Sequence, residues 1–574
     1  MTAPPDDIAS IINSAPEVVL PPAHEPGGAP AYPPSGPPMD PPTSEDIFEA
    51  CARFEQNDTG NGRRLLTHFG ADIVHVRDIG WHVWVATHWA LEGGQEAVEI
   101  CAQKTAALMA KEAGYLAPSK AEEEVMRQAQ GLAGREGGLS DAEKKLILAA
   151  KQAEENLAQR QNKRRAWSIS CGNRSRTVAM ISQALPHRTL APDDMNREGR
   201  YFNVLNGTLW FRRRVRRVRD DECPDPDIER FIDIVEVDVQ MIAHNREHMI
   251  THLAPVAYDP AAICAQFLAF LERFQPNART RCFLQVAAGR ALLGGASTQV
   301  LIFLFGEGAN GKSVFMETLT RVIGTYAGRL RPESITGAME QSGDKASPDF
   351  ARLAGARFVA IAELPRGAPL REGLIKTMTG GEPMPVRHLN KGFFDLVPQF
   401  IPFMSGNQMP EVSGLDRGIW RRLKFVPWTV TIPPTEQKPL PEVVAGFMAE
   451  APGILNWMIE GARIFLTEGL IEPPDVLELG EEHRGDSDPV GQFVKACVEH
   501  RPGSKVQART AYKAFEAWCA ANSVRAWKEK SFSTAFKLKG FKREDGRVRH
   551  WLDIALSGVP DNPDNQPRNP YGSL

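Results

Sequence analysis

A glycine-rich loop is the part of this sequence with the clearest chemistry. Residues 306–313 read Gly-Glu-Gly-Ala-Asn-Gly-Lys-Ser and fit the pattern G-x-x-x-x-G-K-[ST]. Glycines let successive N–H groups turn toward one point, where the positive end of the following helix adds to them. Lys312 would reach the β and γ phosphates, and the Ser313 hydroxyl would coordinate Mg²⁺. The expected binding residues are Gly306, Glu307, Gly308, Ala309, Asn310, Gly311, Lys312, Ser313 and Val314.

Two further polar residues follow apolar runs that are typical of buried strands. Glu363 ends the run ARFVAIAEL (356–364), and Asn407 follows the apolar residues 400–404. Glu363 would hold Mg²⁺ through water and polarise the attacking water, while Asn407 would contact the γ-phosphate or that water. Because Ala362 precedes Glu363, one carboxylate would serve both roles unless a second acid comes from elsewhere. A buried strand that ends in a surface glutamate is the alternative.

Basic residues lie on both sides of Asn407 in the sequence. Arg421 and Arg422 form a pair of the kind that supplies an arginine finger, from a neighbouring subunit if the protein forms a ring. Before Asn407, a turn-rich stretch carries Arg387, His388 and Lys391, for which a solvated loop is the alternative to a role in binding.

Composition narrows the class of protein. The 574 residues are enough for two to four domains, and a net charge of -4 leaves nucleic-acid binding to local clusters. The eight cysteines are far apart and lack zinc spacing, which fits a reducing cytoplasm. No apolar run reaches the length of a membrane span, and the N-terminus lacks a signal-peptide pattern. We expect a soluble protein in a bacterial host cytoplasm, without a membrane partner.

The pattern of segments predicts an α/β fold with the glycine loop in its central domain. An α+β region precedes that domain, and a helix–helix–hairpin pattern near the C-terminus resembles a winged helix. The predicted segments are a disordered proline-rich tail (1–44), an α+β domain (45–258), a helical neck (259–295), an ATPase core (296–470), a linker (471–487), a winged-helix-like domain (488–556) and a polar tail (557–574).

Several clusters outside the glycine loop have two interpretations each. Trp81, Trp84 and Trp89 favour a core over base stacking, because they alternate at strand period. Ser140 and Glu143 predict a capping box in a solvated helical hairpin, whose basic end Lys163–Arg165 is a candidate for DNA contact. Six arginines between Arg212 and Arg219 suit either a phosphate backbone or a charge-guarded edge strand. Asp233, Glu236 and Asp238 are candidate primase metal ligands or a surface strand.

The C-terminal pattern carries its own basic cluster. DNA contact and a role in folding alone are both compatible with it. Its members are Lys528, Lys530, Lys537, Lys539, Lys542, Arg543, Arg547 and Arg549.

The ordered set of motifs resembles the superfamily 3 helicases of phages and plasmids, the motor half of satellite-phage and poxvirus type primase-helicases. The motifs are GEGANGKS, FVAIAE, K-x-x-T-G-G-E, MSGNQMP and GIWRRLKFVPW, within about 125 residues. Upstream, FNVLNGTL, HMITHLAPVAYDP and FLQVAAGRALLGG are similar to that family's pre-helicase region. The resemblance implies an AAA+-like P-loop core and a ring, usually a homo-hexamer, that uses ATP and Mg²⁺.

Residue roles follow from the same resemblance. Lys312 would belong to Walker A, Glu363 to Walker B and Asn407 to sensor 1, with Arg421 or Arg422 as the arginine finger. Arg387, His388 and Lys391 would lie on a hairpin that grips single-stranded DNA in the ring pore.

We therefore expect a DNA helicase for phage, plasmid or integrated-element replication, acting on single-stranded and forked DNA with a separate primase or replication protein. The family's 3′ to 5′ polarity is carried over by resemblance. The chain ahead of the motor leaves no room for a complete primase domain, so we expect unwinding rather than priming. A primer-synthesising primase and a P-loop ATPase that loads replication proteins without unwinding are the alternatives.

Overall fold

We describe the chain from a computed structural model. The described ranges are 44–132, 138–219, 231–295, 298–337, 348–364, 368–389, 391–412 and 417–557. The predicted tails therefore lie outside the described residues, except for Ser44 and Ser557. Contacts divide the chain into two units, one of Met1–His68 with Gln103–Thr177 and one of Phe69–Ala102 with Val178–Leu574. The predicted 45–258 segment contributes to both, and the fold as a whole is mixed α/β.

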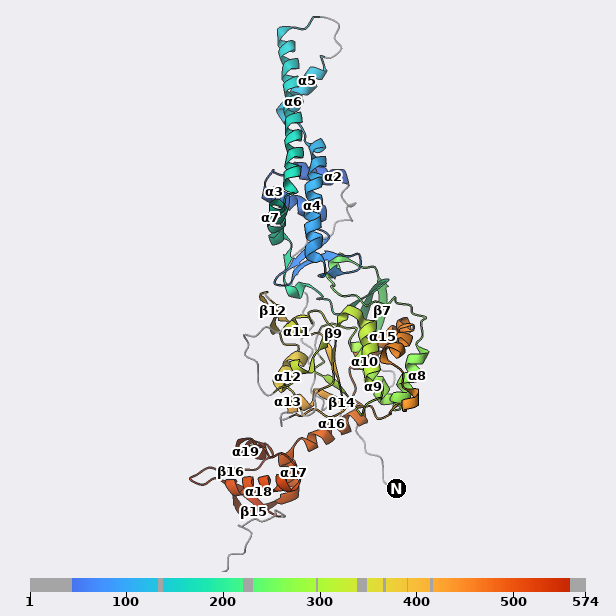
Figure 1. Cartoon of the computed structure of the whole chain (residues 1–574), viewed down its shortest axis with the longest axis vertical. Coiled ribbons are helices and arrows are strands. Elements are labelled where there is room, and N and C mark those ends of the chain that lie inside the picture. The colour runs from blue at the N-terminus through green and yellow to red at the C-terminus, as the bar shows by residue number, and fades with distance from the viewer. Residues whose placement is uncertain are drawn as a thin grey trace, which may run out of the picture. The chain divides into compact units, whose positions relative to one another are not determined.

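The first unit is helical in its described part. Its helices include α2 (Ser44–Ala52), most of α3 (Asp58–Phe69) and the end of α4 (Gly94–Glu112). Figure 1 shows α5 (Lys120–Gln130) beside the longer α6 (Asp141–Cys171). The predicted capping box is confirmed, because the Ser140 hydroxyl accepts from the Glu143 N–H while the Glu143 carboxylate accepts from the Ser140 N–H at 2.8 Å. This pair of bonds fixes where α6 begins.

A buried ion-pair cluster holds the first unit together. The Glu112 carboxylate accepts from Arg64 at 2.9 Å and from Arg164 at 2.5 Å, and all three side chains are buried. Leaving any one of these charges without its partner would be costly in a low-dielectric core. Arg164 therefore belongs to the core, and the expectation that this member of Lys163–Arg165 contacts DNA is wrong.

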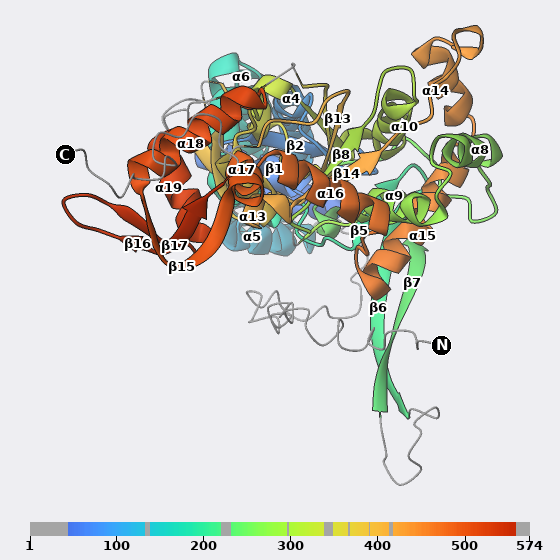
Figure 2. The same ribbon diagram turned by 90° about the horizontal axis from the view of Figure 1, so that it is seen from below.

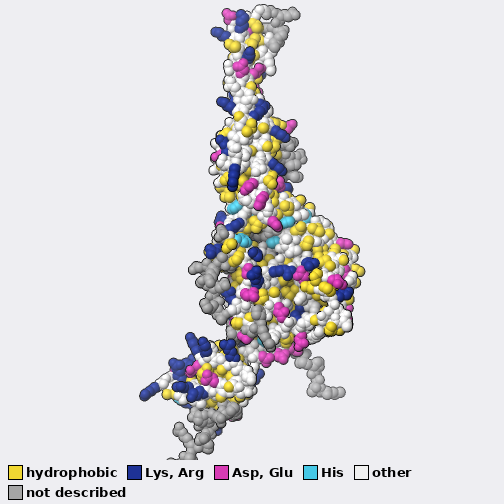
Figure 3. All heavy atoms as spheres, viewed as in Figure 1, with side chains coloured by type: hydrophobic (Ala, Val, Ile, Leu, Met, Phe, Trp, Pro, Cys, Tyr) yellow, Lys and Arg dark blue, Asp and Glu magenta, His cyan; other side chains and the backbone are white. Residues whose placement is uncertain are grey.

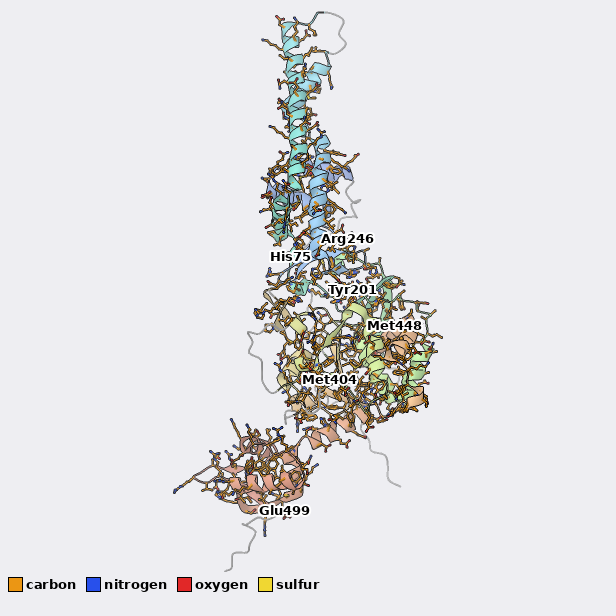
Figure 4. The ribbon with its side chains drawn as sticks, in the orientation of Figure 1. His75, Tyr201, Arg246, Met404, Met448 and Glu499 are labelled. Carbon is orange, nitrogen blue, oxygen red and sulfur yellow. The ribbon has the colours of Figure 1, made fainter. Side chains whose placement is uncertain are left out.

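The second unit begins with a four-stranded sheet in the order β3-β2-β1-β4. The strands are β1 (Ile73–Val76), β2 (Gly80–Trp84), β3 (Trp89–Ala90) and β4 (Thr189–Leu190). Trp81 and Trp89 are buried, which confirms the core interpretation for both. Trp84 is half-buried, with the Arg246 guanidinium 5.6 Å from its ring centroid. Figure 4 labels Arg246 and also His75 of β1.

A second sheet carries the arginine-rich strand. Its order is β5-β6-β7, with β5 (Tyr201–Val204), β6 (Gly207–Arg219) and β7 (Phe231–Ile242). Figure 2 shows β6 and β7 projecting together from this unit as a two-stranded ribbon. β6 is the middle strand only over residues 208–210, which pair with both β5 and β7, whereas its arginine-rich half pairs with β7 alone. The edge-strand interpretation therefore stays open for the arginines, next to phosphate binding. The register places Arg212, Arg214 and Arg217 opposite Asp238, Glu236 and Asp233. Cross-strand pairs of opposite charge stabilise such a ribbon.

A five-stranded parallel sheet forms the centre of the second unit. The order is β14-β8-β13-β10-β9, and its strands are β8 (Leu301–Phe305), β9 (Ala327–Leu330), β10 (Phe358–Ile361), β13 (Ile401–Gly406) and β14 (Leu423–Pro427). Alternate residues enter different cores: Ile302 and Phe403 join one hydrophobic cluster, while Phe303 and Met404 join another. Met404 is labelled in Figure 4. Burial on both faces explains the uninterrupted apolar runs in the sequence.

The remaining elements surround this sheet or connect it to other parts of the chain. They are α7 (Arg174–Ala184), α8 (Ala265–Phe274), α9 (Ala278–Arg290), α10 (Lys312–Ile323), α11 (Pro348–Ala351), α12 (Glu372–Gly380), β11 (Met384–Arg387), β12 (Phe393–Leu396), α13 (Arg417–Trp420), α14 (Leu440–Met448), α15 (Ala451–Glu468) and α16 (Pro474–Asp486). No helix in the described ranges has both the length and the apolar character needed to cross a bilayer.

The C-terminal domain has a hydrophobic cluster of its own. The elements follow the order α17 (Pro489–Cys497), β15 (Val498–Gln507), α18 (Ala508–Ala521), α19 (Glu529–Leu538), β16 (Arg543–Glu544) and β17 (His550–Leu556). Phe493, Phe515, Phe532 and Trp551 lie at its centre. The two first helices, α19 and the closing hairpin agree with the sequence-based expectation. β15 was missed, because its Pro-Gly pair and its exposed residues are not typical of a strand.

Candidate nucleotide site

The glycine loop (residues 306–313) joins β8 to α10 and is held in shape by the chain after β14. The Asn310 side-chain amide donates to the Trp428 carbonyl at 2.9 Å, and the Ile432 N–H donates to the Ala309 carbonyl at 2.7 Å. A Cβ on Gly306 would lie 2.0 Å from the Trp428 oxygen, so only glycine fits there. Gly311 has a φ of 85°, which also favours glycine. The loop is therefore preorganised by backbone contacts.

Lys312 is the first residue of α10, and its ammonium lies inside the loop. It donates to the Gly306 carbonyl at 2.5 Å, to the Asn310 side-chain oxygen at 3.0 Å and to the Asn407 side-chain oxygen at 3.2 Å. The residue is buried, and burial lowers the pKa of Lys312 to about 8, while Glu363 acts in the opposite direction. The Lys312 ammonium contacts only neutral oxygens within the described ranges. A bound anion would therefore favour its charged form and raise its pKa again.

Three predicted site residues meet at one edge of the parallel sheet. β10 pairs with β13 and β13 pairs with β8, all in parallel, so their carboxyl ends share an edge. Glu363 comes two residues after β10, Asn407 directly follows β13, and Lys312 follows β8 through the loop. Glu363, Asn407 and Ser313 are exposed, whereas Lys312 is not. Exposed oxygens around a buried ammonium can hold a hydrated divalent cation and a phosphate chain.

The paired arginines lie at the opposite edge of the same sheet. Leu423 is in register with Leu301, so Arg421 and Arg422 precede β14 where β8 begins. The Arg421 guanidinium is exposed and donates to the Gln299 side chain at 3.0 Å. Arg422 is buried and donates to the Gly418 carbonyl at 2.7 Å. A strand of five residues spans about 16 Å, so neither arginine reaches the glycine loop of its own subunit.

The three basic residues before Asn407 lie on or beside an antiparallel hairpin, β11–β12. The Arg387 guanidinium lies 4.7 Å from the centroid of the Phe393 ring, and the His388 ring stacks on Phe394 with centroids 5.7 Å apart. The Lys391 ammonium donates to the backbone carbonyl of Ile79, the residue directly before β2. The hairpin therefore contacts the N-terminal sheet of the same unit. Sequence reasoning missed this contact, since nothing near Ile79 marks it.

Parts of the chain resemble known proteins. The family model described as D5 N terminal like matches residues 62–276. A candidate helicase of Frog virus 3 is 27% identical over 305 residues, covering 49% of this chain and 31% of that protein. This chain is a D5-type primase-helicase family member. Its match to the family model ends before the glycine loop, whereas the motifs from GEGANGKS to GIWRRLKFVPW lie after residue 276.

Other relatives of this D5-type family member carry two kinds of name. A candidate helicase of Acanthamoeba polyphaga mimivirus is 34% identical over 161 residues, or 28% of this chain and 16% of that protein. A candidate primase of African swine fever virus is 24% identical over 200 residues, or 34% of this chain and 20% of that protein. The chain spans less than a third of each of these curated relatives. The apo structure of the NrS-1 C-terminal region covers 58% of this chain and 95% of that chain at 10% identity, with a TM-score of 0.35, too low to establish a shared fold.

The acids considered as primase ligands do not converge in this D5-type family member. Glu236 and Asp238 share one face of β7, whereas Asp233 lies on the other face, and each stands opposite an arginine or close to one. Arg216 pairs with Glu236 at 3.2 Å. The placement supports the surface-strand interpretation, because separated carboxylates beside arginines do not form a two-metal site.

One group of possible metal ligands does occur within the described ranges: Cys51, His68 and Glu112. Glu112 is already paired with two arginines, and burial raises the pKa of Cys51 to about 12. A protonated thiol beside two guanidinium groups is a poor cation site. We interpret this group as part of the helical core of the first unit.

Proposed function

We propose that this D5-type family member is an ATP-driven, ring-forming DNA helicase of viral, phage or plasmid replication. The observation that carries the proposal is the meeting of Lys312, Asn407 and Glu363 at one edge of a parallel sheet. The hairpin follows β10 and precedes β13, so it is attached to the two strands that carry Glu363 and Asn407. Relatives named as helicases support the same class.

Mg-ATP is the group that these residues fit. The glycine loop and the N-terminus of α10 would hold the phosphates, with Lys312 beside the β and γ positions. Ser313 and Glu363 would hold Mg²⁺, the Glu363 carboxylate through water. Glu363 would also accept a proton from the attacking water, and Asn407 would orient that water. Mg²⁺ supplies charge neutralisation at the transferring phosphoryl group.

A ring completes the site. Because Arg421 is exposed at the far edge of its own sheet, it is free to face the phosphates bound by a neighbouring subunit. A head-to-tail contact whose rotation closes on itself generates a ring, here a homo-hexamer by the family resemblance. Arg387, His388 and Lys391 would contact single-stranded DNA in the pore. Lys391 would exchange its bond to the Ile79 carbonyl for a phosphate.

An unwinding assay tests the proposal. Wild-type protein with Mg-ATP should release the labelled strand of a forked duplex. Lys312→Ala protein should not, with ATP turnover lower by at least about a hundredfold, because the ammonium that stabilises the transferring phosphate is gone. ATP turnover without strand release would favour the loading ATPase. Oligonucleotide synthesis from labelled nucleotides that survives Lys312→Ala would favour a primase.

A second prediction concerns pH. In the free protein the pKa of Lys312 is about 8, and bound triphosphate should raise it, so binding takes up a proton. The affinity for ATP should therefore fall as pH rises through 8, by up to about tenfold per pH unit. Calorimetry in two buffers of different ionisation enthalpy measures both the affinity and the proton uptake.

The matched variant is Lys312→Arg, whose guanidinium stays charged in this range. Its affinity for ATP should be weaker at pH 7.5 and nearly independent of pH. A wild-type profile that is flat from pH 7.5 to 9.5 would contradict the assignment of Lys312 as the phosphate ligand.

A further inference from the structure

We propose that the C-terminal domain contains a duplex-DNA site on α19 and the adjoining β16–β17 hairpin, separate from the β11–β12 hairpin. It rests on the proposed action on DNA but not on ATP hydrolysis. A hollow of about 420 Å³ lies between these elements. Its lining residues are Glu529, Lys530, Ser533, Thr534, Lys537, Arg543 and Arg549.

The helix α19 has two sharply different faces. Phe532, Ala535 and Phe536 are buried in the domain core. The opposite face carries four polar residues at helical spacings of three, one and three: Lys530, Ser533, Thr534 and Lys537. Lys530, Thr534 and Lys537 are exposed, and Ser533 is half-buried. The core thus fixes the helix while leaving a polar, basic face open.

The hairpin adds cations to that face. Arg543 is held in place, because its guanidinium donates to Asp545 at 2.8 Å and lies 5.7 Å from the centroid of the Trp551 ring. Arg549 lies 3.9 Å from the same carboxylate. Figure 3 shows Lys and Arg side chains gathered on the domain that carries α19. The lining has four cations and one carboxylate, Glu529, and Asp545 beside the two arginines balances one further charge. The charge that remains is positive and suits a polyanion.

The shape of this surface favours duplex DNA over a single strand. An exposed helix of α19's kind fits the major groove, where lysines at its two ends would meet phosphates on either side. Ser533 and Thr534, between the lysines, carry short side chains that can bond to base edges. Single-strand binding instead uses stacked aromatic rings, and the residues that line this hollow include none.

The test uses full-length Lys312→Ala protein without nucleotide, so that hydrolysis plays no part. Fluorescence anisotropy would measure binding to a labelled 20-base-pair duplex and to one of its strands over a range of salt concentrations. Adding Lys530→Ser and Lys537→Ser should weaken duplex binding at least tenfold and lower the log–log salt slope by about 1.8, or 0.9 per lost phosphate contact.

Two variants serve as controls. Lys495→Ser with Lys513→Ser removes the same charge from exposed positions on α17 and α18, and it should leave the salt slope unchanged. Glu529→Gln removes the carboxylate from the hollow and should tighten duplex binding, which a misfolded domain would not do.

Three results would overturn the duplex site. They are an unchanged slope in the lysine variant, an equal loss for duplex and single strand, and weaker duplex binding by Glu529→Gln. None of them bears on the helicase proposal, which fails only if ATP-dependent strand release is absent.

Discussion

Mixing Arg421→Ala protein with Lys312→Ala protein is expected to restore ATP hydrolysis that neither protein has alone. Removing an arginine finger costs about 10³-fold or more in turnover. Arg421 and the glycine loop lie at opposite edges of one sheet, so in the proposed ring each complete site would take its arginine from one subunit and its loop from the next. In a random equimolar ring about one interface in four combines an intact loop with an intact arginine. Turnover should therefore recover to about a quarter of the wild-type value.

The control for this experiment is Arg417→Ala. Arg417 is an exposed arginine at the start of α13, the short helix that ends one residue before Arg421, and no site role is assigned to it. Its turnover should stay close to wild type. No recovery on mixing, under conditions where the subunits are shown to exchange, would mean that Arg421 does not act between subunits. Recovery with Arg422→Ala in place of Arg421→Ala would transfer the role to Arg422.

Glu363→Gln is expected to separate ATP binding from hydrolysis. The amide keeps the size of the carboxylate but cannot accept the water's proton, and Ala362 offers no second acid beside it. Turnover should fall by roughly 10²–10⁴-fold, as for the loss of a general base. The affinity for ATP, measured by titration with labelled nucleotide, should change little by comparison. The variant should also remain assembled in ATP.

Glu411→Gln is the matched control, since Glu411 is an exposed carboxylate whose backbone carbonyl, not its side chain, accepts from Leu370. Its turnover should be unaffected. If Glu363→Gln hydrolyses ATP at a normal rate, the base must be another residue, and the structural alternative for Glu363, a surface glutamate at the end of a strand, would hold.

The strongest sequence signals belonged to elements buried on both faces. The apolar runs before Gly306, Glu363 and Asn407 predicted three strands, and the structure pairs all three in parallel. Such strands are recognisable because no residue in them has to face water. The capping box at Ser140 could be predicted equally well, because the two side chains that define it are three residues apart.

Long-range contacts could not be predicted from the sequence in the same way. Arg164 stands in a run of basic residues that suggests a solvated surface, and only its pairing with Glu112, 52 positions earlier, makes it a core residue. The pairing of the arginine-rich half of β6 depends on β7, which follows a segment outside the described residues. The contacts that shape the glycine loop are made by the backbone carbonyl of Trp428, which every residue type possesses. A single sequence contains no signal for such partners.

The contact between the glycine loop and Trp428 also has a consequence for synthesis of the protein. β8 lies between β13 and β14, and the loop that follows it bonds to Trp428 and Ile432. Chains fold from the N-terminus as they leave the ribosome. The first unit and the N-terminal sheet can therefore form while the glycine loop is still without its supports. The loop can take its observed shape only after Ile432 has emerged, so the proposed nucleotide site is among the last parts of the second unit's central sheet to be completed.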